Sequence, residues 1–249
     1  MKYYPFTSVH HGVVNVGDLP IPFDVVLNSS ALVVLITFVY LKISWKESLI
    51  THREEFFNDK GNLIGKLFGF LLLFLLIAPG IVSNESAKTS ISPLLLWVFL
   101  WIGVPVLGLL FGDVYAKFNP LNLFSINSNK PKSVYLACIL FVGLTWFELV
   151  WRKPGNPFNI GVVFILLFIS VNSSRYFLKK SLIEVDPLLL LHYLYSKLQL
   201  FNSRPYFRSL LDNIGNLARL KGIEYFVLLM IGTVTYDGLR ETTFWYEQF

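Results

Sequence analysis

The residues best placed for chemistry lie near the end of the chain, in the stretch 231–245. Asp237 ends an apolar run and is followed by Gly238, Arg240 and Glu241. An acidic residue and an arginine three positions later lie on one face of a helix, where they can pair. A carboxylate at the end of a membrane span is costly to bury, so it needs a partner or a function. Two interpretations are open: Asp237 and Arg240 form a site for a cation or substrate, or they only cap the helix end.

Two further acidic residues are candidates for the same site. Glu148 lies near the end of an apolar run and four residues before Arg152. It is therefore either a proton or ion site, or half of a helix-end ion pair. Asp18 stands in the proline-rich N-terminal segment, near His10 and His11. Neighbouring histidines without a spaced third ligand do not make a metal site, so the sequence predicts no metal.

Asp113 and Asn172 are candidates for a second site on the other side of the membrane. Asp113 follows an apolar run and precedes Lys117 by four residues, so it is either a helix-end cap or part of an inner-face site. Asn172 lies within an apolar run, where it forms an interhelical hydrogen bond or contacts a substrate. The chain carries no phosphate-binding loop, nucleophile elbow or zinc-protease motif. The sequence therefore predicts no catalytic residue and no cofactor.

The composition indicates what kind of protein holds these residues. Of the 249 residues, 54% are hydrophobic, and the mean hydropathy is +0.58. This is too apolar for an ordinary soluble domain and typical of several membrane spans. The single cysteine, Cys138, excludes an internal disulfide and a cysteine-based metal cluster. We expect an all-α polytopic membrane helix bundle that contacts the lipid bilayer and does not bind nucleic acid.

Six apolar runs are predicted to cross the membrane. Crossing a hydrocarbon core of about 30 Å takes about 20 helical residues. The runs cover residues 25–44, 63–82, 93–112, 134–151, 158–177 and 223–236. The last is the shortest, and it crosses only if the helix continues through Asp237 or the bilayer thins locally. Pro105, in the middle of the third run, is expected to kink it, because proline removes a helical hydrogen bond.

The chain between the fifth and sixth runs does not look like a span. Residues 187–201 have too few consecutive apolar residues, so we expect an amphipathic interfacial helix or a re-entrant helix there. With the basic stretch that follows, it forms a predicted cytoplasmic region at 178–222. The other predicted units are an extracytoplasmic N-terminal segment (1–24), a five-span membrane domain (25–177), and the sixth span with an outer cap (223–249).

The basic residues predict the orientation of the chain. Most of the 21 lysines and arginines lie in the loops after the first, third and fifth spans. Loops rich in these residues stay in the cytoplasm. Both termini are then outside a plasma membrane. Asp18, Glu148, Asp237 and Arg240 lie near the outer face, and Asp113 and Asn172 near the inner face.

Several short motifs, in order along the chain, resemble a family of uncharacterised integral membrane proteins from archaea and actinobacteria. They are H-G at 11–12, D-L-P-I-P at 18–22, W-x-G-x-P-x-L-x-L-L-F-G-D-V at 101–114, N-P at 119–120, T-Y-D-G at 235–238 and F-W at 244–245. The resemblance implies a multi-pass protein of the plasma membrane and supplies no catalytic residue. Family members look longer, so it also implies a shortened member or the N-terminal part of a longer one.

The leading functional hypothesis is a transport-related or permease-like protein. It rests on polar residues at helix ends, the proline in the third span, and two three-span halves of opposite topology, as in many transporters. One alternative is a non-catalytic subunit or assembly factor of a membrane complex, favoured by the 16% aromatic content and the absence of catalytic motifs. A weaker alternative is an intramembrane lipid-modifying enzyme, which needs acid and base groups in contact range.

Overall fold

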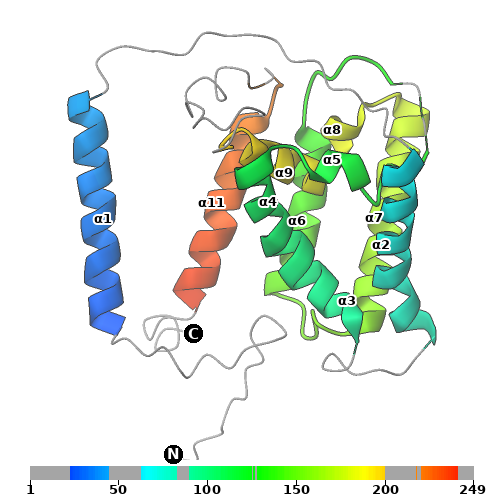
Figure 1. The fold of residues 1–249 in the computed structure, drawn as a ribbon, viewed down its shortest axis with the longest axis horizontal. Helices are drawn as coiled ribbons and strands as arrows, with labels where there is room; N and C mark the ends of the chain where they lie inside the picture. The colour runs from blue at the N-terminus through cyan, green and yellow to red at the C-terminus, as the bar shows by residue number, and fades with distance from the viewer. Residues whose placement is uncertain are drawn as a thin grey trace, which may run out of the picture.

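The computed structural model describes residues 23–44, 63–82, 90–124, 126, 128–199, 217 and 220–240. All elements named in these ranges are helices (Figure 1). Within the same ranges, extended backbone pairs only at an isolated parallel bridge between Ser133 and Lys221. The all-α prediction is confirmed for this part of the chain. Asp18 and the rest of the predicted N-terminal segment before residue 23 lie outside the described residues.

The long helices follow the predicted apolar runs. They are α1 (Phe23–Ser44), α2 (Leu63–Val82), the continuous rod of α3 (Ile91–Pro93), η2 (Leu94–Gly103) and α4 (Val104–Phe111), then α6 (Tyr135–Leu149), α7 (Pro157–Leu178) and α11 (Ile223–Arg240). Short helices lie between them: α5 (Tyr115–Phe118), α8 (Leu182–Val185) and α9 (Pro187–Ser196). The predicted last run of 223–236 is too short, because the helix continues through Asp237 to Arg240.

Three helical stretches are long and apolar enough to cross a membrane. They are Leu63–Val82, Ile91–Phe111 and Pro157–Leu178. Helix α6 has only 15 residues, and α11 carries Glu224, Asp237 and Arg240. The described apolar part of α1, Asn28–Val39, is also shorter. These three helices therefore do not meet the same conditions of length and polarity, and the membrane character of the chain rests on the other three.

The middle of the third apolar run is a π-helix. The N–H of Val104 donates to the carbonyl of Phe99, five residues earlier. The π-helix ends at Gly103, and Pro105 lies in the first turn of the α-helix that follows. A proline ring in an α-helix clashes with the carbonyl four residues earlier. The wider π-turn opens the helix at that point. The proline predicted to kink this span therefore follows a change of helical geometry at Gly103.

Helices α2 and α7 pack along each other at one edge of the bundle (Figure 1). Glycines line their contact. A side chain at Gly80 would overlap the backbone of Pro157, and a Cβ at Gly161 would lie 3.2 Å from the carbonyl oxygen of Ile77. Small residues let membrane helices approach closely enough for their backbones to touch. The short helices α5 and α8 pack against this pair, α5 against α2 and α8 against α7.

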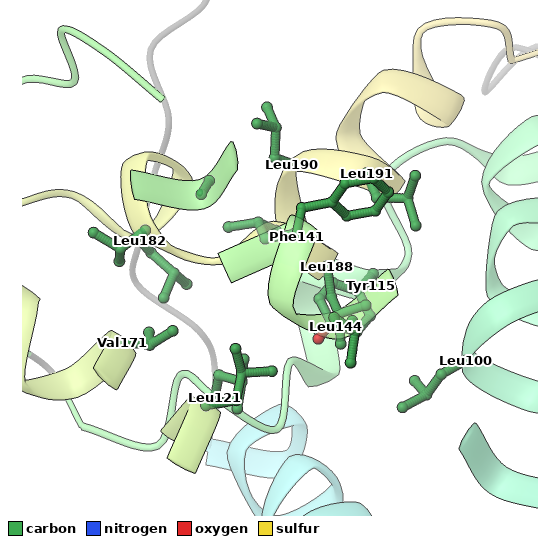
Figure 2. Close-up of a cluster of buried hydrophobic side chains, with 14 of the residues drawn as sticks. Leu100, Tyr115, Leu121, Phe141, Leu144, Val171, Leu182, Leu188, Leu190 and Leu191 are labelled. Carbon is green, nitrogen blue, oxygen red and sulfur yellow. The ribbon is translucent and has the colours of Figure 1, made fainter. Parts of the chain in front are cut away.

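Helix α9 differs from its prediction. Eight of its ten residues are buried, and it packs against α4, α5, α6 and α8. An amphipathic interfacial helix would keep one face in water or headgroups, so that interpretation is wrong for residues 187–196. Side chains of α6, α7, α8 and α9 instead share one buried apolar cluster, which includes Leu188, Leu190 and Leu191 (Figure 2). A helix buried inside the bundle agrees better with the re-entrant helix, the other interpretation of this segment.

Helices α1 and α11 expose most of their apolar surface. Helix α11 packs against α6 through Phe226, whose ring lies 4.7 Å from that of Phe141 between centroids. Phe226 is the one fully buried side chain of α11. Helix α1 stands apart in Figure 1, and all of its described side chains are exposed. Such surfaces suit contact with lipid or with other membrane helices, since water does not solvate them favourably.

Candidate functional site

Glu148 and Asp237 line one cavity whose walls come from η2, α6, α9 and α11. The cavity has a volume of about 120 Å³. The two carboxylates lie close enough for the charge of Asp237 to act on Glu148. The remaining wall is mostly apolar and aromatic: Trp101, Phe141, Leu149, Leu191, Tyr195, Met230, Thr233 and Val234. The structure therefore brings together two of the residues that the sequence predicts for an outer-face site.

The parallel course of α6 and α11 explains why these carboxylates line the same cavity. Both helices begin at the end of the bundle near α8 and α9 (Figure 1). Their starts are tied together at the Ser133–Lys221 bridge, where Val134 N–H donates to the Lys221 carbonyl at 2.9 Å. Glu148 and Asp237 then follow at nearly the same number of residues after the bridge. At about 1.5 Å per residue, they reach the same depth.

Arg240 lies beside the cavity and holds the end of α6. Its Nη1 donates a hydrogen bond to the main-chain carbonyl of Leu149. The last carbonyls of a helix have no partner within the helix and carry partial negative charge, so an arginine there is favourable. Arg152 does not form the predicted ion pair with Glu148 among the described residues, because α6 ends at Leu149 and Arg152 is exposed in the turn beyond.

The two inner-face candidates are separate from this cavity. Asp113 Oδ1 accepts a hydrogen bond of 3.2 Å from Ala116 N–H at the start of α5. Burial raises the pKa of Asp113, against the opposing effects of the Ala116 N–H and of Lys197 and Lys117. This geometry is that of a helix cap. Asn172 donates from Nδ2 to the carbonyls of Leu121 at 3.3 Å and Phe168 at 2.9 Å, which is the geometry of a hydrogen bond between a helix and a neighbouring segment.

A buried polar cluster near Asn172 was not predicted. Asp186, between α8 and α9, is fully buried and accepts three hydrogen bonds. Asn119 Nδ2 donates to Oδ2 at 2.6 Å, and the N–H groups of Leu188 and Leu189 donate to Oδ1 at 2.9 and 3.0 Å. Burial raises the pKa of Asp186 to about 6, although these hydrogen bonds and the charge of Arg175 act to lower it. An ionised Asp186 at neutral pH fits a carboxylate that only accepts.

Arg175 of α7 completes the cluster. It is fully buried, and its Nη1 donates to Asn122 Oδ1 at 3.1 Å and to the Phe124 carbonyl at 3.4 Å. A buried arginine is stable only with charge or hydrogen-bond partners. The cluster therefore joins α7, the loop after α5, and the α8–α9 junction at one point inside the bundle.

Part of this cluster has a signal in the sequence. Asp186 directly before Pro187 is a typical helix start, with an N-cap acid and a proline at the first helical position. Ser181 and Glu184 likewise form a capping box that starts α8. These signals predict where helices begin. They do not show that Asn119, 67 residues before Asp186, reaches the same place.

No metal centre is evident in the described part of the chain, where no three His, Cys, Asp or Glu side chains gather around one point. Comparison with known proteins finds no match: no family model, curated protein or solved structure is similar enough to this chain to indicate a family.

Proposed function

We propose that this protein is a transport-related membrane protein that binds a cation between Glu148 and Asp237. The observation that supports it is the shared cavity of these two carboxylates, about 120 Å³ in volume. Two acidic groups in one mostly apolar cavity repel each other when both are ionised, and a bound cation or proton relieves that repulsion. The aromatic walls of Trp101, Phe141 and Tyr195 also favour positive charge over negative charge.

The proposal includes six crossings with both termini outside a plasma membrane. Helix α11 has 18 residues, about 27 Å at 1.5 Å per residue, which is close to the hydrocarbon thickness. The basic loops after the first, third and fifth spans support a cytoplasmic location for the helix ends that they join. The cavity that Glu148 and Asp237 line would then face the outside of the membrane. Membership of the family of uncharacterised membrane proteins, suggested by the motifs, belongs to the same proposal.

Ion flux into proteoliposomes tests the function. The purified protein is reconstituted, and entry of H⁺, Na⁺ and K⁺ is followed with ion-sensitive dyes inside the vesicles. We expect flux of at least one cation, reduced by about tenfold or more in Glu148→Gln and in Asp237→Asn, as for loss of a positioned ionisable group. Glu224→Gln, an exposed position in the first turn of α11, is the matched control and should leave flux unchanged. Flux equal to that of empty vesicles, or insensitive to both variants, rules the proposal out.

The orientation has its own test. Cys138 is replaced by serine, and single cysteines are placed at the exposed positions Lys153 and Lys132. A membrane-impermeant maleimide added to intact cells should label Lys153→Cys, in the turn between α6 and α7. It should not label Lys132→Cys, before α6. The reverse pattern would show that the basic loops lie outside.

A subunit of a membrane complex is the second candidate. An apolar groove of about 530 Å³ between α6 and α11, together with the exposed α1, offers surfaces for other helices. Trp146, Leu228 and Gly232 are among the residues that line the groove. Size-exclusion chromatography with light scattering, after mild detergent extraction from native membranes, separates the two proposals. A stable partner of fixed stoichiometry supports the subunit, and a monodisperse monomer that conducts cations supports the transporter.

A further inference from the structure

Tyr115 of α5 and His192 of α9 form a buried pair that the proposed cation site does not use. Their ring centroids lie 4.4 Å apart. Tyr115 is 0% exposed and His192 is 2% exposed. The hydroxyl of Tyr115 and both ring nitrogens of His192 have no hydrogen-bond partner among the described protein atoms. Three polar atoms that could each donate or accept are therefore gathered at one place inside the bundle.

Such an arrangement calls for a further polar molecule. A buried polar atom without a hydrogen bond costs about 1–3 kcal/mol. Leu144 and Leu188 belong to the same buried cluster as Tyr115 and supply no polar atom from their side chains (Figure 2). A buried water typically makes about three hydrogen bonds to groups of this kind. The phenol and the neutral imidazole each offer one donor and at least one acceptor, so a water between them can satisfy both.

The charged groups around the pair single out Asp186. Its charge acts on Tyr115, and together with burial it raises the pKa of the phenol well above the ordinary value. Among the elements packed against α9, helix α4 carries no titratable side chain. Helix α5 carries Lys117, which is exposed, and α8 carries Glu184, which is bound to Lys180. Helix α6 carries Tyr135, Cys138 and Glu148.

Helix α9 contributes side chains both to this pair and to the acidic cavity. Leu191 and Tyr195 of α9 line the cavity that holds Glu148 and Asp237. His192, the neighbour of Leu191 on the same helix, instead packs with its ring tilted against that of Tyr115. One helix of ten residues therefore carries groups that belong to both polar sites, and no other described helix does so.

We propose that Tyr115 and His192 hold a buried water and, with Asp186, relay protons between the acidic cavity and the inner side of the bundle. This inference rests on the proposed transport function and assigns H⁺ as the ion that moves. Neutral His192 accepts a proton on one ring nitrogen from a hydronium ion, which becomes water, and releases the proton of the other nitrogen, so the imidazole changes tautomer without net charge. The Tyr115 oxygen accepts that proton through the buried water and passes its own to the Asp186 carboxylate through a second water, because the hydroxyl does not hydrogen-bond Asp186 directly. Asp186 then releases the proton to water on the inner side, which returns the carboxylate to its ionised form. Reorientation of the imidazole ring and of the Tyr115 hydroxyl presents their N–H and O–H groups for the next transfer, and no other reactant is consumed.

The chemistry of each group suits its step. Burial lowers the pKa of His192 to about 3, so the ring is neutral at pH 7 and can accept on one side while it donates on the other. Asp186 is a carboxylate with a pKa of about 6, so it can take a proton and release it again near neutral pH. The Tyr115 hydroxyl stays protonated between transfers, because burial and the charge of Asp186 both disfavour the phenolate.

Proton flux driven by a potassium diffusion potential tests the relay. Vesicles with a pH-sensitive dye receive wild type, Tyr115→Phe, or the matched control Tyr135→Phe, whose ring is exposed at the start of α6. We expect Tyr115→Phe to slow proton entry by about tenfold or more, because it removes only the hydroxyl that passes the proton. The control should conduct like wild type. Equal rates for wild type and Tyr115→Phe overturn the relay, as does wild type without proton flux.

Two additions keep the test decisive. If Tyr115→Phe does not fold, His192→Gln replaces it, with the same expected slowing, and an undiminished rate overturns the relay. Sodium and potassium fluxes are measured on the same vesicles. Flux of either ion that depends on Glu148, without proton flux, means that the relay is wrong and the transport function stands. Absence of flux for all three ions means that the transport function itself is wrong.

Discussion

Asp186→Asn tests the energetics of the buried polar cluster. The carboxyl is fully buried, and burial raises its pKa from an ordinary 3.8 to about 6. A raised pKa means that the folded state holds the proton more tightly than the unfolded chain does. The stability that Asp186 contributes through this proton is complete below pH 3.8 and is lost as the pH rises through about 6.

The size of the effect follows from the two pKa values. Each unit of pKa difference corresponds to about 1.4 kcal/mol, so the gap from 3.8 to about 6 corresponds to about 3 kcal/mol. Asparagine keeps the shape and the cap of α9 but cannot titrate. We expect the stability advantage of wild type over Asp186→Asn to be about 2 kcal/mol larger at pH 4 than at pH 7, because pH 4 lies just above the ordinary pKa of 3.8 and part of the full effect is already lost there. All other titrating groups are common to both proteins and cancel in the difference.

The assay is reversible unfolding in mixed detergent micelles at several pH values from 4 to 8, followed by tryptophan fluorescence. Glu224→Gln is the control, because that carboxyl is exposed in the first turn of α11. An advantage that stays constant with pH would refute the reasoning, since it would mean that Asp186 is not desolvated. An advantage that grows as the pH rises would show that the Asn119 hydrogen bond and Arg175 outweigh burial.

Three further variants probe the packing that holds the sites. Gly80→Leu should lower the free energy of unfolding by about 1–3 kcal/mol, because a side chain there overlaps the backbone of Pro157. The control Gly143→Ala, with open space around it, should be neutral or stabilising by up to about 1 kcal/mol. Equal effects of the two variants in thermal unfolding would contradict the close contact of α2 and α7. Glu184→Gln should cost about 1–3 kcal/mol at pH 7, because it removes an ion pair and weakens main-chain hydrogen bonds; an unchanged melting temperature would show that this cap is dispensable. Arg240→Met should lower flux through the acidic cavity without unfolding the protein, since it frees the end of α11 from α6; unaltered flux in vesicles would mean that the cavity does not need this tie.

The pattern of apolar residues predicts the long helices well. The run at 63–82 coincides with α2, and the run at 158–177 differs from α7 by one residue at each end. Such agreement is expected, because membrane thickness and helix rise together set the length of an apolar run. The apolar pattern does not, however, predict the π-helix that precedes Pro105. That geometry depends on which main-chain hydrogen bonds form locally.

The sequence identifies the acidic residues of the candidate site but not the cavity that they share. Glu148 and Asp237 stand out in the sequence because they are acidic residues beside apolar runs, but their shared cavity depends on the Ser133–Lys221 bridge, which starts α6 and α11 side by side. That bridge joins segments 88 residues apart through main-chain atoms alone, which leave no residue-type signal.

The sequence by itself determines that this is a helical membrane protein, where its long apolar helices lie, and which side chains are unusual for their surroundings. Only the tertiary structure decides that eight of the ten residues of α9 are buried, that Asn119 donates to Asp186, and that His192 packs against Tyr115. The physical reason is that helix formation and lipid solubility are local properties of a segment. Burial of a polar group depends on which distant segments close around it, and that depends on the path of the whole chain.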